Sequence, residues 1–365
     1  MTENAFSYYS FLKDGGYMGK VNHYYDGTKL LSMKDLDGET PEVFLCTSNR
    51  TAGKTTYFNR LCINRFLNKK IRKFALLYRF QTELESVVDT FYKDIHGLFF
   101  PSFDLTAESR DKGHFMELFL NEEACGYALP INCADAIKKK SHLFSDVDLM
   151  YFDEFMSETN KYCPDEFRKF MSIHTSLARG NGQLVRYLPV IMVSNPVTLL
   201  NPYYINMDIA ERISSSTKFL RGHGYVLEQG YSKYASEAQK ASGFNKAFSK
   251  SDYIDYGAEG VYLNDSRNFI DKPSGKSKYC ATLLYKNVEY AVRQYAAQGI
   301  MYCDKSVDPG FPLRISVTTE DFKPNYIMLK NNDFILNDFK YYFKLGCFRF
   351  RDIQSKEALI KSIAY

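Results

Sequence analysis

Short apolar segments recur through the N-terminal part of this chain and alternate with stretches whose apolar residues follow helical spacing. In Lys54–Asn68, for example, Phe58, Leu61, Cys62 and Phe66 fall on one face of a helix. Strands that are apolar throughout and alternate with helices indicate a mostly parallel sheet covered on both faces. We therefore expect an α/β domain whose strands are Glu42–Cys46, Phe74–Arg79, Leu149–Phe152 and Pro189–Val193.

The chain changes character after Asn201-Pro202, where a polar segment rich in Ser, Lys, Tyr and Gly begins. A length of 365 residues exceeds one ordinary core and suggests two domains with a small piece between them. We expect an α/β domain over 1–203, a helical linker or hinge over 204–256 and an α+β domain over 257–365. Strands of the last part are expected at Lys278–Tyr285, Val288–Tyr295 and Gly299–Cys303, before a helical C-terminus.

Composition excludes several classes of protein. The 47 Lys and Arg residues nearly balance the 43 Asp and Glu residues, so a net charge of +4 permits nucleic-acid contact only through local patches. The eight cysteines form no CxxC pair and no histidine cluster completes a zinc pattern, which indicates free thiols in a reducing compartment. The sequence shows no signal peptide and no apolar run long enough to span a bilayer. We expect a soluble, intracellular protein that does not insert into membranes.

A phosphate-binding loop is expected between the first strand and the first helix. Such a loop needs a tight turn whose backbone N–H groups point inward at a helix N-terminus. Gly53 permits close backbone approach, Lys54 would reach the β- and γ-phosphates, and the Thr55 hydroxyl would coordinate Mg²⁺. Ser48 stands where the GxxxxGK[ST] pattern has its first glycine. The residues expected to bind ATP are Ser48, Asn49, Arg50, Thr51, Ala52, Gly53, Lys54, Thr55 and Thr56.

Polar residues follow the third and fourth predicted strands at the points where those strands end. Asp153 would hold Mg²⁺, and Glu154 would polarise the attacking water. Asn195, after the fourth strand, could contact the γ-phosphate or the attacking water. The alternative interpretations are two surface carboxylates and an ordinary turn capped by Asn195. Together with the loop at Lys54, these residues predict an ATPase domain of the P-loop (ASCE, RecA-like) class.

These motifs, in this order, resemble the DNA packaging ATPases of phi-29-like tailed phages. The matching stretches are TSNRTAGKTTYFNRLCINRF, FALLYRFQTEL, LMYFDEF, VSNPVTLLNPYY and YYFKLGCFRF. The resemblance implies a homo-oligomeric ring, pentameric in the best-known case, that pushes double-stranded DNA into a procapsid. It implies action in the host cytoplasm, transiently on the portal (connector) vertex, with a packaging RNA as a candidate further partner.

The resemblance also implies roles for four arginines. ATP would sit between neighbouring subunits, and an arginine from one subunit would reach the γ-phosphate bound by the next. Arg179 is the candidate for this arginine finger, and Arg186 is the reserve candidate. Arg50 could contact phosphate within its own subunit, and Arg79 could couple nucleotide state to neighbouring loops.

In the resembling family, the C-terminal domain is an RNase H-like nuclease fold that has lost its chemistry. A working site needs several carboxylates around two metal ions. Tyr279–Tyr285 contains no acid, Asp304 closes a later strand and Asp271 precedes the set. We therefore expect no nuclease activity.

Contact with DNA should involve phosphates rather than bases. Lys138, Lys139 and Lys140 lie ahead of the Asp153 strand and are expected to face the DNA channel. Solvated charge is the alternative for these lysines and for two further patches, at 69–73 and at 349–351.

Other functions remain open from the sequence. They are another P-loop translocase or helicase, a terminase-type enzyme with nuclease activity, and a scaffold that binds capsid or portal without turning over ATP. The adenine pocket is not evident, although Tyr8, Tyr9 or Phe11 could stack on the base.

Overall fold

A computed structural model of the chain describes residues 24–159, 161–179, 184–199, 201–210, 212–213, 217–248, 257, 268–328, 333–345 and 347–363. The described residues form two compact units. One lies within 1–197 and 215–261, and the other lies within 198–214 and 262–365. No helix in the described ranges combines the length and the apolar character needed to cross a bilayer.

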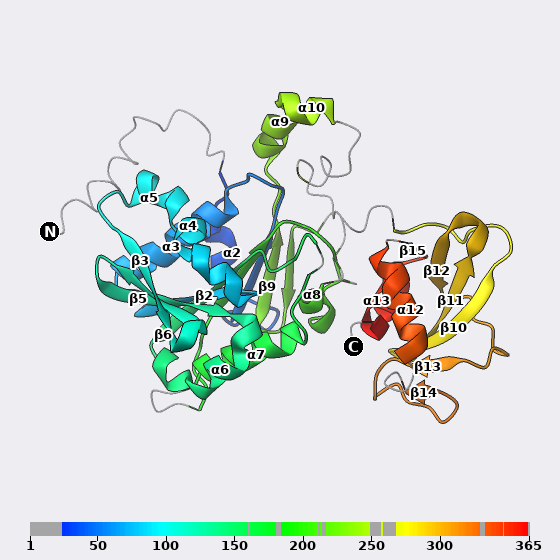
Figure 1. Ribbon diagram of the computed structural model, residues 1–365. Helices are drawn as coiled ribbons and strands as arrows, with labels where there is room; N and C mark the ends of the chain where they lie inside the picture. Colours follow the sequence, from blue (N-terminus) through cyan, green and yellow to red (C-terminus); the bar gives the residue numbers. More distant parts are fainter. Residues whose placement is uncertain are drawn as a thin grey trace. The chain divides into compact units, whose positions relative to one another are not determined.

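The first unit is built on a sheet with the order β3-β4-β5-β2-β6-β7-β1-β9-β8 (Figure 1). The six strands from β5 to β9 in this order are mutually parallel, and antiparallel strands flank them at both edges. The expected mostly parallel α/β sheet is therefore confirmed. The strands are β1 Val43–Thr47, β2 Lys73–Tyr78, β3 Leu105–Arg110, β4 Phe115–Leu120, β5 Glu123–Pro130, β6 Val147–Asp153, β7 Val190–Ser194, β8 Phe219–Gly222 and β9 Tyr225–Gln229.

Helices cover both faces of this sheet. In Figure 1, α3, α4 and α5 lie on one face and α6 and α7 on the other. The α3 side chains Phe58, Cys62, Ile63 and Phe66 are buried at helical spacing against the strands, which explains why this segment is a helix. The helices are α2 Thr28–Ser32, α3 Lys54–Leu67, α4 Val87–Phe91, α5 Lys93–Phe99, α6 Ala134–Lys139, α7 Glu166–Leu177, α9 Lys233–Ala241 and α10 Gly243–Ala247.

Two parts of this sheet are absent from the sequence-based expectations. The strands β3, β4 and β5 form an extension beyond β2, and β5 is parallel to β2 although it follows an antiparallel hairpin. The segment expected as a linker, 204–256, contributes β8 and β9 to the same sheet, with β9 parallel to β1. Pairing between strands distant in the chain decides both features, and local periodicity does not report it.

The second unit has a sheet with the order β14-β13-β10-β11-β12-β15. Its three predicted strands are confirmed as the antiparallel set β10, β11 and β12, and two helices of the C-terminal segment pack on one face of the sheet (Figure 1). The elements are α8 Pro202–Asn206, β10 Lys278–Tyr285, β11 Val288–Tyr295, β12 Ile300–Asp304, β13 Arg314–Ser316, β14 Ile327–Met328, α12 Asp333–Lys344, β15 Phe348–Phe350 and α13 Ile353–Ile363.

The NPYY motif has a structural role in this unit. Asn201 caps α8 by accepting hydrogen bonds from the backbone N–H groups of Tyr203 (3.1 Å) and Tyr204 (3.0 Å). Pro202 occupies the first turn, where its missing N–H is not needed. Both tyrosines are fully buried, so this motif starts a helix and fills a core.

A substitution at Gly126 tests the packing of β5 on β2. A Cβ at Gly126 would lie 2.5 Å from the carbonyl oxygen of Phe74 and 2.9 Å from its ring. We expect Gly126→Ala to lower the free energy of unfolding by roughly 1–3 kcal/mol because backbone cannot move aside. In the control Gly97→Ala, on α5, the added Cβ meets nothing within 4 Å, and a gain of roughly 0.4–1 kcal/mol is expected. Denaturant unfolding of both variants measures this, and equal stabilities would contradict the packing.

Candidate nucleotide-binding site

The loop between β1 and α3 turns sharply enough to present its backbone to an anion. Two residues adopt the left-handed conformation, Thr51 with φ of 59° and Gly53 with φ of 92°. Gly53 does so without steric cost, whereas a β-branched Thr51 in this region is strained by about 1–3 kcal/mol. The first helical hydrogen bond follows at once, from Tyr57 N–H to the Gly53 carbonyl (3.0 Å). The free N–H groups of this helix start therefore adjoin the loop.

Lys54 is buried beneath this loop and is the central cation of the site, with only 6% of its surface exposed. Its Nζ donates to the Ser48 carbonyl (2.9 Å), Ser48 Oγ (2.9 Å) and the Asn49 carbonyl (3.2 Å). It also donates to Asn195 Oδ1 (3.2 Å). All four acceptors are neutral, and none of the described carboxylates forms an ion pair with Lys54. Burial lowers the pKa of this ammonium. A buried cation held by neutral oxygens fits an anionic ligand such as a triphosphate.

Ser48 replaces the expected glycine without disturbing the turn. Its φ is not positive, so the position does not require glycine. Gly230 lies opposite, where a Cβ would approach the Ser48 side chain to 3.3 Å, and its missing side chain leaves room for the serine. The Ser48 hydroxyl then becomes one of the oxygens that hold Lys54.

Asp153 ends β6 beside the loop. The Thr55 hydroxyl, expected to share Mg²⁺ with it, acts on its carboxylate and favours the charged form, which on its own would lower the pKa of Asp153. Burial acts more strongly and raises the pKa of Asp153, although the hydrogen bond from the Glu154 backbone N–H also acts in the opposite direction. A hydroxyl beside a partly desolvated carboxylate suits Mg²⁺, which takes one or two protein ligands and completes its shell with phosphate oxygens and water.

Glu154 lies next in the chain, with its side chain exposed and its backbone in the left-handed region at φ of 54°. Desolvation by surrounding atoms raises the pKa of Glu154, and the charges of Asp153 and Glu158 raise it further. A carboxylate with a raised pKa is a better general base near neutral pH than an ordinary one.

Strand order brings these residues together. Strand β7 lies between β1 and β6, and the register pairs Thr47 with Ser194 and Asp153 with Val193. The carboxyl ends of the three parallel strands therefore meet at one edge, with Lys54, Asn195 and Asp153 around it. The structure thus brings these three predicted site residues together at one edge of the sheet.

Arg79 fixes the backbone that carries Glu154. Its guanidinium is buried, and its Nε donates to both carboxylate oxygens of Glu166, at 2.9 and 3.1 Å. It also donates to the carbonyl of Phe155 (2.9 Å) and, more weakly, to that of Glu154 (3.4 Å). Glu166, the first residue of α7, has no recognisable motif in the sequence and was not anticipated.

The other arginines divide into internal and exposed groups. Arg50 forms an ion pair with Glu158, and Arg186 is buried and donates to the carbonyls of Val147 and Leu177. A buried arginine bound to its own subunit cannot reach a neighbour, so the reserve assignment of Arg186 is wrong. Arg179 is exposed just beyond α7, and the glycine-containing residues 180–182 lie outside the described residues.

The segment after β9 contacts the loop, a feature that the sequence did not signal. Asn49, fully buried, exchanges hydrogen bonds with the backbone of Ser232 (2.9 Å each way), the residue that caps α9. Gln239 Nε2 donates to the Arg50 carbonyl and to Thr51 Oγ1, both at 2.9 Å. Helix α9 thus supports the strained part of the loop from the β9 side.

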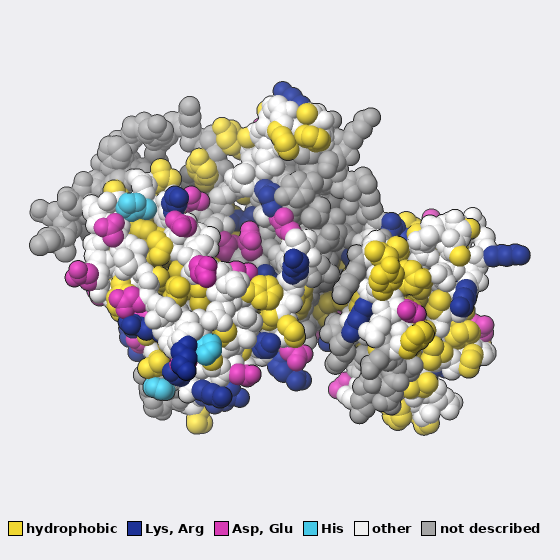
Figure 2. Space-filling model, in the orientation of Figure 1, with side chains coloured by type: hydrophobic (Ala, Val, Ile, Leu, Met, Phe, Trp, Pro, Cys, Tyr) yellow, Lys and Arg dark blue, Asp and Glu magenta, His cyan; other side chains and the backbone are white. Residues whose placement is uncertain are grey.

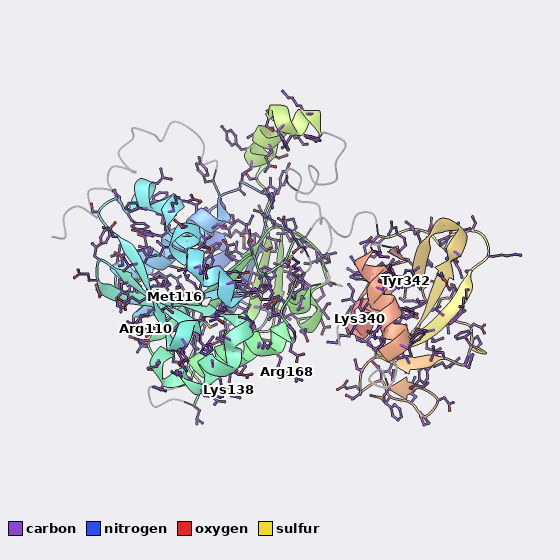
Figure 3. The ribbon with its side chains drawn as sticks, in the orientation of Figure 1. Arg110, Met116, Lys138, Arg168, Lys340 and Tyr342 are labelled. Carbon is purple, nitrogen blue, oxygen red and sulfur yellow. The ribbon has the colours of Figure 1, made fainter. Side chains whose placement is uncertain are left out.

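The triple lysine lies in helix α6 and its cap rather than in a loop, because Ala134–Lys139 is helical. Cations at a helix C-terminus are favoured by the helix dipole. Lys138 and Lys139 are exposed, whereas Lys140 pairs with Asp111 at 2.5 Å. Side chains of Lys and Arg gather over α6 and α7 in Figure 2, and Figure 3 places Lys138 and Arg168 on these two helices.

The two further basic patches are largely neutralised by acids. Lys69 pairs with Glu123 (2.6 Å) and Arg72 with Asp148 (2.6 Å). In the second unit, Arg351 pairs with Asp271.

Replacing Asp153 tests the electrostatics of the site. The folded pKa of Asp153 lies above its unfolded value, so ionisation destabilises the fold above the folded pKa, and this cost disappears as pH falls through it. We expect Asp153→Asn to raise the melting temperature at neutral pH, with the gain shrinking in acid. Calorimetry across pH measures it.

Asp148, at the start of the same strand, is the matched control. Burial acts against its charge, but hydrogen bonds from Arg72 lower the pKa of Asp148. Asp148→Asn should therefore lower the melting temperature at neutral pH. If Asp153→Asn instead lowers the melting temperature as Asp148→Asn does, the charged Asp153 carboxylate does not destabilise the fold, and the expected effect of its burial is wrong.

Comparison with known proteins gives a consistent result. The Podovirus DNA encapsidation protein (Gp16) family matches residues 18–365. The DNA packaging protein of Bacillus phage phi29 is 25% identical over 320 residues, covering 87% of this chain and 90% of the relative. The DNA packaging protein of Bacillus phage B103 is 24% identical over 286 residues, covering 77% and 83%.

Two solved structures share the fold. The bacteriophage Phi-29 viral genome packaging motor assembly superimposes with a TM-score of 0.54 at 21% identity, covering 94% of this chain and 97% of that one. The Phi-28 gp11 DNA packaging motor gives a TM-score of 0.56 at 13% identity, covering 94% and 98%. Because the family match spans nearly the whole sequence, this chain belongs to the Podovirus DNA encapsidation protein (Gp16) family.

Proposed function

We propose that this chain hydrolyses ATP and uses the energy to drive double-stranded DNA into a procapsid. The observation that carries the proposal is the buried ammonium of Lys54, held by neutral oxygens next to the Thr55–Asp153 pair. Membership of the DNA encapsidation family supplies the cargo, and the strand order with β7 between β1 and β6 supports a P-loop domain of the ASCE, RecA-like class.

Each side chain of the site has a defined task in this proposal. Lys54 and the N–H groups near Gly53 bind the phosphates, and Asn195 orients Lys54 or the attacking water. Thr55 and Asp153 would hold Mg²⁺, which neutralises charge on the phosphate oxygens. Glu154 accepts the proton of the attacking water, and Arg79 keeps Glu154 in position through the backbone of 154 and 155.

Two substitutions test the ATPase. We expect Lys54→Ala to abolish nucleotide binding and Glu154→Gln to retain binding while lowering kcat by roughly 10²–10⁴-fold, because only the proton acceptor is removed. Turnover and nucleotide binding are measured on each purified variant. A wild type that turns over ATP no faster than these variants would favour a scaffold that binds portal without hydrolysis.

We further propose that subunits form a homo-oligomeric ring, with five copies, and that Arg179 reaches the γ-phosphate bound by its neighbour. Its exposure at the end of α7 supports this assignment. Arg179→Ala should lower turnover by roughly 10³-fold, as for arginine fingers in general. The control Arg221→Ala, exposed on the edge strand β8, should leave turnover unchanged.

A mixing experiment separates a finger that acts on the neighbour from one that acts within its own subunit. Rings made only of Arg179→Ala or only of Lys54→Ala subunits should turn over ATP poorly, but a mixed ring places an intact Arg179 beside an intact Lys54. Recovery of turnover on mixing is expected. Absence of recovery, with rings still formed, would place Arg179 within its own subunit or outside the reaction.

DNA is proposed to contact the exposed surface of α6, where Lys138 and Lys139 are free to bind phosphates and Lys140 is held by Asp111. The double substitution Lys138→Ala with Lys139→Ala should reduce the slope of log affinity against log salt by about 2, since each phosphate contact contributes about 0.9. The matched pair Lys69→Ala with Lys70→Ala should change it less, because Lys69 already pairs with Glu123. If the Lys69 and Lys70 pair changes the slope more than the Lys138 and Lys139 pair does, DNA contacts the end of α3 and not α6.

The second unit is proposed to be an RNase H-like domain without nuclease activity. Three antiparallel strands extended by parallel ones, with helices on one face, support the fold. Asp304 is buried with Lys272 3.6 Å away, and no cluster of three metal-binding side chains occurs within the described ranges. These observations favour a packaging motor over a terminase-type nuclease.

The proposed setting is the host cytoplasm, where the ring binds the portal of the procapsid, with a packaging RNA as a further partner. The hinge role expected for residues 204–256 is restricted in this proposal to α9 and α10, because β8 and β9 belong to the sheet.

A further inference from the structure

Strand order determines the direction in which the nucleoside part of a bound nucleotide extends from the phosphate loop. Asn195 follows β7 and Asp153 ends β6, and both strands lie on the same side of β1. The reacting phosphate must lie on this side, between Lys54 and Asp153. The other end of a bound nucleotide therefore extends toward the opposite neighbour of β1, which is β9.

Tyr25 occupies that opposite side and is held rigidly. Its backbone N–H donates to the Ala52 carbonyl in the phosphate loop (2.8 Å), and its hydroxyl donates to Glu228 Oε2 on β9 (2.7 Å). Its ring packs edge-on against Tyr57, with the ring centroids 5.5 Å apart. Burial raises the pKa of Tyr25, so the hydroxyl remains a donor at neutral pH.

The residue before it has the opposite environment. The Tyr24 side chain is 77% exposed, and it makes no hydrogen bond, ion pair or ring contact with any residue in the described ranges. It lies against the phosphate loop, since a Cβ built on Gly53 would be 3.3 Å from the Tyr24 ring. The anchored Tyr25 thus holds the Tyr24 ring at the start of α3, where it has no partner among the residues that the structure describes.

The Tyr24 ring faces solvent beside the phosphate loop, next to a closely packed turn. Gly27 lies against the first turn of α3, where a Cβ would be 2.7 Å from the Tyr57 ring. Residues 24–27 therefore run close to the start of α3, where the contact with Gly53 also places Tyr24. An aromatic face held at this point can stack on a planar heterocycle, and stacking of this kind tolerates every base.

We propose that Tyr24 is the nucleobase platform of the site and stacks on the purine ring of the bound nucleoside triphosphate. This inference rests on the proposed ATP site and adds the residue that binds the base. Tyr24 is expected to act on affinity alone, since the adjacent Tyr25 is bonded to Glu228 of β9, and β9 lies on the other side of β1 from the Asp153 strand β6. Because stacking reads a π-face rather than hydrogen-bonding edges, discrimination between ATP and GTP by this residue is expected to be weak.

Binding of two probes by the full-length protein tests the proposal. The probes are ATP and inorganic tripolyphosphate, both with Mg²⁺, because only ATP carries a base. Tyr24→Ala should weaken ATP binding by about 10-fold and leave tripolyphosphate binding unchanged, whereas Tyr24→Phe should keep wild-type affinity for both. Tyr341→Ala, at an exposed tyrosine on α12 (60% exposed), serves as the matched control and should alter neither.

The absence of tryptophan from this chain allows a direct reading of stacking. The substitution Tyr24→Trp introduces a single indole whose fluorescence should be quenched by ATP and not by tripolyphosphate. Thermal unfolding of every variant confirms that the fold is retained, which the high exposure of Tyr24 favours.

The outcomes separate this inference from the proposed function. If the wild type binds both probes, but Tyr24→Ala binds ATP as tightly as Tyr341→Ala does, the base platform is wrong and the ATP site stands. If Tyr24→Ala loses both probes equally, the ring supports the loop and does not bind the base. If the wild type binds neither probe, the ATP site itself is overturned together with its base platform.

Discussion

A buried ammonium that pairs with none of the described carboxylates is the constraint on which the rest of this structure depends. Lys54 lies beneath the loop it belongs to and is held by two backbone carbonyls, a hydroxyl and an amide oxygen. Neutral oxygens compensate a buried positive charge only in part. The positive charge of Lys54 at the N-terminus of α3 is therefore only partly compensated, and the negative charge of a bound triphosphate would compensate it further.

Contacts from both sides hold the loop around Lys54 in position. The loop is supported from the β7 side by Asn195 and from the β9 side by Tyr25, Ser232 and Gln239. Buried Arg79 bridges α7 and the backbone that follows Asp153, so that Glu154 is placed by a rigid contact. Breaking a buried, hydrogen-bonded pair such as Arg79–Glu166 leaves an uncompensated charge, which makes this link stiff and resistant to change.

Helices α9 and α7 of the first unit contact the two backbone segments that flank the phosphate site. Strain at Thr51 and Glu154, both in the left-handed region, lies on the two segments that flank the phosphates. Gln239 holds the first of these segments and Arg79 the second. A ligand that changes either backbone must alter the contacts of α9 or α7, and α7 is followed directly by Arg179, the proposed contact with a neighbouring subunit.

The sequence by itself determined the local features. The four strands, the helix Lys54–Leu67, the loop with Gly53, Lys54 and Thr55, and the acids after β6 were all predicted, because burial periodicity and turn chemistry act over a few residues. The tolerance of Ser48, the pairing of Arg79 with Glu166, the burial of Arg186 and the position of Tyr24 beside Gly53 were decided by tertiary structure. So were the places of the strands β5 and β9, which pair with β2 and β1, far away in the chain. Each of these features is a contact between distant residues, and which distant residues meet depends on the order of the strands, which local periodicity does not encode.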